Sequence, residues 1–87
     1  FSKAFLETTA IIAYKQPVTR GDIEDIRGIS VNSNIIRTLL ELEWIKVVGH
    51  RETPGKPELF GTTSKFLDYF DKNTLSDLPE ISDVDSL

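Results

Sequence analysis

Imidazole is a common general base and metal ligand, and the chain contains a single histidine, His50. It has no neighbouring cysteine, serine nucleophile or recognisable base partner, so we interpret it as a solvated loop residue. Three carboxylates, Asp22, Glu24 and Asp25, lie close together in the sequence. Acidic residues in the first turns of a short helix favour the helix dipole and water, and we interpret these three in that way. We therefore predict no enzyme activity, no catalytic residue, no metal site and no cofactor.

The stretch from Gly49 to Lys56 contains two glycines followed by a lysine, as a phosphate-binding loop does. Five residues separate its glycines where that motif has four, and Pro57 stands where the motif needs a serine or threonine. This comparison excludes a nucleotide site of that type. The chain also has no cysteine, which excludes disulfides and thiolate zinc sites and suits a reducing compartment.

Basic side chains that contact phosphates are the remaining candidates for chemistry. Residues 1–70 hold nine Lys or Arg against nine Asp or Glu, whereas residues 71–87 hold one against five, which accounts for the net charge of −4. The charge of Arg37 is balanced by Glu41. Further along, the basic residues Lys46, Arg51 and Lys56 are accompanied by the acidic residues Glu52 and Glu58, which reduce the positive charge of the predicted hairpin. Nucleic-acid affinity needs several uncompensated phosphate contacts, so direct DNA binding by this chain is not expected.

The elements that must position these residues begin with two helices. Residues 3–14 contain no proline or glycine and place apolar residues at helical spacing, and Pro17 must break this first helix. A short extended piece follows. Thr19 and Asp22 have the spacing of a capping box for a second, short helix. Gly28 is predicted to end it as a left-handed residue.

Ser30 is predicted to cap a third helix with a broad apolar face made of Val31, Ile35, Ile36, Leu39, Leu40 and Leu42. Residues 44–48 are aromatic and β-branched around Lys46, residues 58–60 are Glu-Leu-Phe, and the two segments predict two strands. Between them lies Pro54-Gly55, a pair preferred at the centre of a type II turn. The strands and this turn predict a β-hairpin.

Thr62 or Thr63 is predicted to cap a last helix, and residues 74–77 repeat the capping pattern before a proline. The predicted fold is α+β, a winged helix-turn-helix of three helices and a β-hairpin wing, with a short C-terminal helical extension. We expect one winged-helix domain over residues 1–79 and an acidic, disordered tail over residues 80–87. No apolar run approaches the ~20 residues that span a bilayer, so we expect a soluble, cytoplasmic protein.

Several specific runs are distributed along residues 4–79: residues 5–20 (FLETTAIIAYKQPVTR), 22–28 (DIEDIRG), 36–41 (IRTLLE), 48–49 (VG), 53–57 (TPGKP), 60–63 (FGTT), 66–70 (FLDYF) and 75–79 (LSDLP). They resemble the bacterial segregation and condensation protein B family. Proteins of that family carry two winged-helix domains, and this chain resembles the second. The resemblance implies that the first domain, which is missing here, forms a homodimer of the full-length protein.

The resemblance also implies an architectural activity without catalytic residues. The family joins a kleisin subunit, segregation and condensation protein A, and through it an SMC ATPase, in the nucleoid-associated complex that compacts and partitions chromosomes. We therefore expect a kleisin-binding domain that acts in chromosome condensation and segregation during cell division. A winged-helix DNA-binding transcriptional regulator is the alternative. A neutral, partly apolar groove favours the first function and a positive stripe along the third helix and wing favours the second.

Aromatic and arginine side chains suit protein contacts, and the set that we expect to bind the partner is Tyr14, Gln16, Arg20, Arg37 and Arg51. Trp44, Phe60 and Tyr69 are further possible anchors, although these three and Tyr14 are each expected more often to complete a small core. The family usually has glycine at the position of Glu43. Either Glu43 takes the left-handed conformation after the third helix, or the helix continues through it.

Overall fold

The computed structural model describes residues 1–70. The capping pattern at residues 74–77 and the acidic tail expected at 80–87 lie outside the described residues. The first helix, α1, spans Lys3–Lys15, and its first turn is capped by Ser2, whose Oγ accepts from the backbone N–H of Phe5 (3.1 Å). The helix ends before a cis Gln16-Pro17 peptide bond, because proline has no N–H with which to continue it.

The second helix, α2, spans Arg20–Arg27 and has the predicted ends. Thr19 Oγ1 accepts from the N–H of Asp22, and the Asp22 carboxylate accepts from the N–H of Thr19, both at 3.0 Å, so the capping box is confirmed. Gly28 has a φ of 77° and closes the helix in the left-handed region, which glycine enters without a Cβ penalty.

The third helix, α3, spans Ser33–Glu41, and the prediction that Ser30 caps it was wrong. Asn32 is the cap, and its Oδ1 accepts from the N–H of Asn34 (2.8 Å). The carbonyl of Val31 accepts from Arg20 (2.6 Å), and the N–H of Ile35 donates to the carbonyl of Asn32 instead. Val31 therefore precedes the helix, with its side chain buried in the core and its N–H donating to Glu24 Oε2 (2.8 Å).

Glu43 has a φ of 60°, so the chain does turn into the left-handed region after α3. The N–H of Glu43 donates to the carbonyl of Leu40 and the N–H of Trp44 donates to that of Leu39, each at 3.0 Å. This is the pair of bonds of a Schellman motif, which satisfies carbonyls that the helix end would leave without partners. The structure thus decides between the two alternatives for Glu43: the helix does not continue through it.

The two strands, β1 (Ile45–His50) and β2 (Glu58–Thr62), form an antiparallel hairpin. The predicted turn is confirmed: Gly55 has a φ of 85°, and the N–H of Lys56 donates to the carbonyl of Thr53 (2.8 Å). The pairing shifts register between Val47 and Gly49, which leaves Val48 as a β-bulge. On its other side β2 meets Val18, which exchanges two backbone hydrogen bonds with Phe60.

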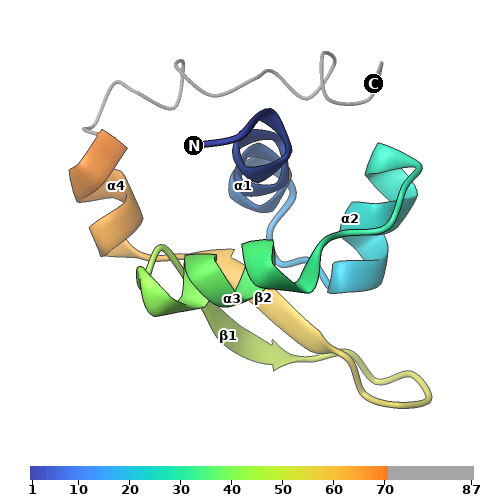
Figure 1. Cartoon of the computed structure of the whole chain (residues 1–87). Coiled ribbons are helices and arrows are strands. Elements are labelled where there is room, and N and C mark those ends of the chain that lie inside the picture. The colour runs from blue at the N-terminus through green and yellow to red at the C-terminus, as the bar shows by residue number, and fades with distance from the viewer. Residues whose placement is uncertain (71–87) are drawn as a thin grey trace.

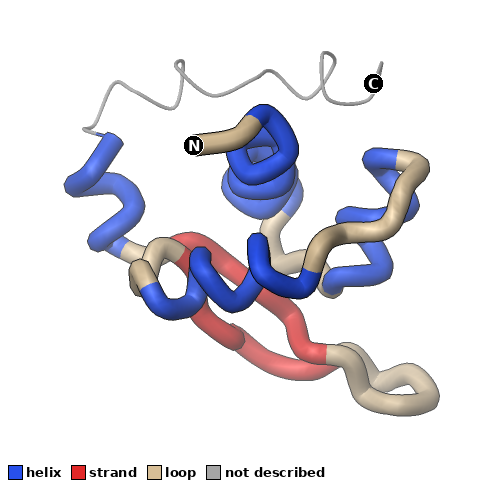
Figure 2. The backbone as a smooth tube through the Cα atoms, viewed as in Figure 1, coloured by secondary structure: helices blue, strands red, loops and turns tan. Residues whose placement is uncertain are grey.

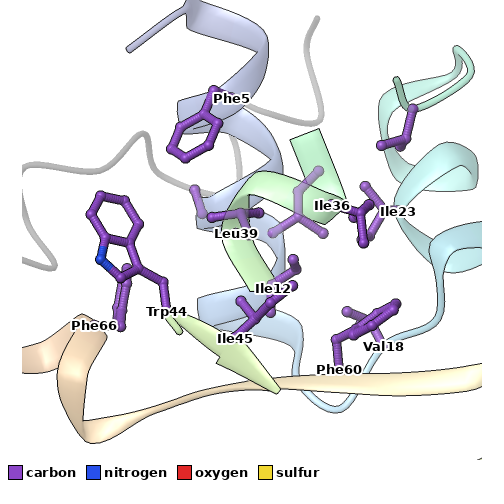
Figure 3. Close-up of a cluster of buried hydrophobic side chains, with 13 residues drawn as sticks. Phe5, Ile12, Val18, Ile23, Ile36, Leu39, Trp44, Ile45, Phe60 and Phe66 are labelled. Carbon is purple, nitrogen blue, oxygen red and sulfur yellow. The ribbon is translucent and has the colours of Figure 1, made fainter. Parts of the chain in front are cut away.

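The last described helix, α4, spans Ser64–Phe70, and Thr63 caps it by accepting from the N–H of Phe66 (3.2 Å). The helices α2 and α4 lie on opposite sides of α1 (Figure 1), and α1 packs against both α3 and β2. The loop between the strands projects from this body (Figure 2). The buried side chains converge between the helices and the hairpin, with Trp44 and Phe66 at one end of the core and Val18 and Phe60 at the other (Figure 3).

Candidate functional site: a partner-binding surface

Gln16, one of the residues expected to contact a partner, fastens α1 to β2. Its Oε1 accepts from the backbone N–H of Thr62 (2.8 Å), and its Nε2 donates to the Thr62 hydroxyl (3.1 Å) and to the carbonyl of Ala13 (3.0 Å). A Cβ at Gly61 would lie only 3.1 Å from the same Oε1, so the glycine lets the amide approach the strand. The side chain of Gln16 is therefore engaged within the chain.

Arg20 holds the turn between α2 and α3. One of its guanidinium nitrogens donates to the carbonyl of Val31 (2.6 Å) and another to Ser33 Oγ (3.0 Å). Its Nε lies 3.5 Å from the Glu24 carboxylate. Because Glu24 also accepts from the N–H of Val31, these four residues fix the geometry of the segment that leads into α3.

Arg51 ties the wing to the start of α2. Its two terminal nitrogens donate to the two carboxylate oxygens of Asp22, each at 2.7 Å, in the bidentate geometry that arginine favours. These bonds, aided by the backbone N–H of Thr19, lower the pKa of Asp22 from 3.8 to about 2 against the raising effect of burial. The backbone N–H of Arg51 donates to the carbonyl of Pro57 (2.9 Å), which closes the base of the loop.

Arg37 and Tyr14, the two other members of the expected set, also lie at the surface. The Arg37 side chain is 68% exposed on α3, where it is hydrogen-bonded to Asn34 and lies 3.9 Å from the Glu41 carboxylate. Tyr14, at the end of α1, is 38% exposed. Gln16, Arg20 and Arg51 therefore brace the fold, while all five residues remain at least partly exposed.

Most of the basic side chains of the described residues lie beside acidic side chains of the same chain. Besides Arg20 and Arg51, Arg27 donates to the buried carboxylate of Glu7 (3.3 Å) between α2 and α1. His50 is exposed at the end of β1. No group of three or more His, Cys, Asp or Glu side chains that suits a metal ion occurs within residues 1–70.

An aromatic hollow, which sequence reasoning did not find, lies between the end of α3 and α4. Its volume is about 570 Å³ and its lining includes Trp44, Tyr69 and Leu42 together with Phe1. Trp44 is buried, as is Phe60, whereas Tyr69 is 61% exposed. The expectation that these aromatic residues complete the core thus holds for Trp44 and Phe60 and fails for Tyr69. The sequence gives one indication of this hollow, the three aromatic residues within residues 66–70. That pattern does not reveal their contact with the end of α3.

The three helices, the hairpin and its projecting loop define a winged-helix domain, as the sequence predicted. Residues 1–81 match the protein family described as "Segregation and condensation complex subunit ScpB". The chain belongs to this family. Because the match covers nearly the whole chain, it includes every element of the described fold.

Individual relatives agree with this assignment. The chain is 57% identical over 84 residues to the "Segregation and condensation protein B homolog" of Coxiella burnetii (97% of this chain, 40% of that protein). It is 49% identical over 83 residues to the "Segregation and condensation protein B" of Moorella thermoacetica (95% and 42%). The chain thus spans about two fifths of the length of these relatives.

Solved structures show the same fold. The crystal structure of ScpB from Mycobacterium tuberculosis superposes with a TM-score of 0.74 and 38% sequence identity, over 82% of this chain and 43% of that one. A structure of a conserved hypothetical protein from Chlorobium tepidum gives a TM-score of 0.73 and 44% identity, over 78% and 41%. Within the part of the chain that the structure describes, no helix is both long and apolar enough to cross a membrane.

Proposed function

We propose that this domain is a non-enzymatic part of the bacterial SMC–kleisin complex. In this role it binds the kleisin, segregation and condensation protein A, and through the kleisin acts with the SMC ATPase in chromosome condensation and segregation. The observation that carries the proposal is the family match over residues 1–81, since the family is described as a complex subunit. In this role the domain acts in the cytoplasm, at the nucleoid. The full-length protein acts as a homodimer.

The charge distribution supports a protein partner over DNA. Residues 1–70 carry equal numbers of basic and acidic side chains. The wing arginine, Arg51, is held by Asp22, and Arg37 on the outer face of α3 is accompanied by Glu41. A domain with this balance has few of the clustered, uncompensated positive groups that phosphate binding requires, whereas a nearly neutral surface suits protein association.

We assign different roles to the five expected contact residues. Gln16, Arg20 and Arg51 maintain the shape of the surface, because each is engaged by backbone or carboxylate groups of its own chain. Tyr14 and Arg37 contact the kleisin. An exposed tyrosine and an exposed arginine are residue types that contribute strongly to protein interfaces when they become buried there.

Calorimetry with peptides that tile the middle region of the kleisin from the same organism tests this function. We expect micromolar binding by one segment, and a loss of affinity of at least about fivefold in the Tyr14→Ala and Arg37→Ala variants. Asp25→Ala, at an exposed position on α2, is the matched control and should bind as the wild type does. Absence of heat with every segment would refute the kleisin assignment, and unchanged affinity in folded Tyr14 and Arg37 variants would refute only their contact role.

A further inference from the structure

We propose that a groove beside the wing receives one large apolar side chain of the kleisin. This groove, the wing groove, lies between the start of α2, α3 and the base of the wing, and its volume is about 200 Å³. Its lining consists of Arg20, Gly21, Ile36, Pro57, Glu58 and Phe60. The identity of the partner rests on the proposed function, whereas the site and the chemistry of its occupant are argued from the structure.

The floor of the wing groove is apolar. Ile36 of α3 and Phe60 of β2 are 8% and 4% exposed, and Pro57 adds its ring at the base of the wing. A volume of about 200 Å³ is smaller than the ~300–1,000 Å³ of sites for small-molecule ligands, but it accommodates one large side chain. Side chains that anchor protein interfaces enter well-packed pockets of this kind.

The charges around the wing groove favour an uncharged occupant. Its two charged lining residues, Arg20 and Glu58, have opposite signs. The Arg20 guanidinium is also engaged by the Glu24 carboxylate (3.5 Å) and by the carbonyl of Val31 (2.6 Å). An acidic side chain or a phosphate would meet the Glu58 carboxylate, and a basic side chain would meet the Arg20 guanidinium. An apolar side chain avoids both repulsions.

Both walls of the wing groove are held by residues that we expected to contact a partner. On one wall, Arg20 is fixed by its bonds to Val31 and Ser33. The other wall is the wing, which Arg51 ties to α2 through Asp22. The backbone of Arg51 also closes the base of the wing by donating to the carbonyl of a lining residue, Pro57. The two arginines therefore keep the groove at a constant width, and a groove that is already formed has a lower entropic cost of binding.

The wing groove is continuous with the proposed contact surface. Arg37 directly follows the lining residue Ile36 on α3, and its side chain is 68% exposed. A short segment of the partner can therefore contact Arg37 while one of its apolar side chains fills the groove. Such a pair of contacts combines an arginine with a buried apolar anchor, as the strongly contributing parts of protein interfaces do.

Gly21 provides a test, because a side chain can be added to the lining at this position. A Cβ there would lie 3.7 Å from Thr19 Oγ1, which is an ordinary contact, and no closer to any other atom. Gly21→Leu should therefore keep the fold, which thermal denaturation checks, while it occupies part of the groove. We expect calorimetry of the full chain with the tiled kleisin peptides to show at least about tenfold weaker binding by this variant. Asp25→Leu, which adds the same side chain at an exposed position of α2, is the matched control and should bind within about twofold of the wild type.

A double-mutant cycle identifies the peptide side chain that fills the groove. Alanine substitution of one large apolar residue of the peptide should weaken binding at least about tenfold in the wild type and less than about twofold in Gly21→Leu. The methyl resonances of Ile36 report the same contact in the unaltered protein. They should shift when the peptide binds, whereas those of Ile29, which is exposed between α2 and α3 and does not line the groove, should stay unchanged.

The outcomes distinguish the site from the function. A peptide that binds without shifting the Ile36 resonances, or that binds folded Gly21→Leu as it binds the wild type, overturns the groove as the site and leaves the kleisin function intact. Absence of binding by every peptide overturns both. Without peptide, an Ile36 shift that follows protein concentration assigns the groove to a second copy, and one that follows added duplex DNA assigns it to nucleic acid. A peptide-free shift in Leu75→Ser assigns it to residues of the same chain, and each of these three results overturns the proposal.

Discussion

Glu43 is a glutamate in a conformation that favours glycine. Its φ of 60° lies in the left-handed region, where a Cβ is sterically unfavourable. This conformation allows the two Schellman hydrogen bonds that end α3. Its carbonyl also accepts from the Thr63 hydroxyl, so this residue links the end of α3 to the cap of α4. The backbone position is thus fixed by three hydrogen bonds that do not involve the Glu43 side chain.

We expect Glu43→Gly to stabilise the domain by about 0.5–1 kcal/mol, because glycine removes the Cβ penalty while every backbone bond remains. The lost ion pair with Lys65 is solvent-exposed and contributes little. Urea denaturation of the two proteins measures the difference. Glu41→Gly, inside the last turn of α3, is the control and should destabilise by about 1 kcal/mol. A destabilised Glu43→Gly variant would contradict the assigned conformation.

Asp22 makes stability depend on pH in the acid range. Its folded-state pKa is lowered from 3.8 to about 2, so the stabilisation is fully present above pH 3.8 and is lost as the pH falls through 2. Asp22→Asn removes this titration but keeps a side chain that can accept a hydrogen bond. We expect the stability advantage of the wild type over this variant to be constant near neutral pH and to shrink between pH 4 and 2. Urea midpoints at a series of pH values give this gap, and a gap that persists unchanged to pH 2 would argue against the assigned pKa.

At the scale of elements, α1 and α2 are joined by a nearly buried ion pair. The side chains of Arg27 and Glu7 are 9% and 5% exposed and approach to 3.3 Å. Lys3 also lies 3.8 Å from the second Glu7 oxygen, although that oxygen has no hydrogen-bond partner among the described residues. Removing one member of such a pair leaves a buried charge without its main compensation.

Arg27→Met should therefore destabilise the domain by about 3 kcal/mol. The double variant Glu7→Gln, Arg27→Met should be more stable than Arg27→Met alone, because the uncompensated carboxylate is also gone. Thermal or urea denaturation of Arg27→Met, Glu7→Gln and the double variant measures the coupling free energy between the two side chains. Simple additivity of the two substitutions would show that the ion pair does not couple α1 to α2.

The elements themselves could largely be predicted from the sequence, because their signals are local. Capping residues, a proline and two turn glycines lie within a few residues of the ends that they determine. The start of α3 was misassigned because Arg20, on α2, occupies the carbonyl of Val31, which therefore precedes the helix. That bond depends on how α2 packs beside α3, and the hydrophobic pattern of α3 carries no information about this packing.

The candidate site was less accessible to sequence reasoning for the same physical reason. Arg51 meets Asp22 across 29 residues, and Gln16 meets Thr62 across 46. The residue types were those of a protein interface, but whether such a side chain braces the fold or faces a partner is decided by long-range contacts. The aromatic hollow likewise combines the end of α3 with α4 and the N-terminal residues, which no single segment reveals.

At the scale of the whole molecule, the prediction concerns nucleic acid. The chain as given should bind duplex DNA no more tightly than ~10⁻⁴ M at physiological salt, because its first 70 residues are neutral and residues 71–87 are acidic. Gel shift and fluorescence anisotropy with several duplexes measure this. Asp22→Ala, which releases Arg51, is an informative control and should raise affinity only slightly. Sub-micromolar, sequence-dependent binding would instead support the transcriptional regulator.

The bulge at Val48 also bears on how the molecule avoids aggregation. Within residues 1–70, no strand pairs with the outer edge of β1, and Val47 and Val48 are both exposed there. A straight edge with two valines would template the addition of further chains, strand upon strand. The extra residue interrupts the regular ladder and increases the local twist, while Lys46 places a charge on the same strand. This edge is therefore poorly suited to open-ended growth into fibrils, even at the high local concentration of a multisubunit assembly.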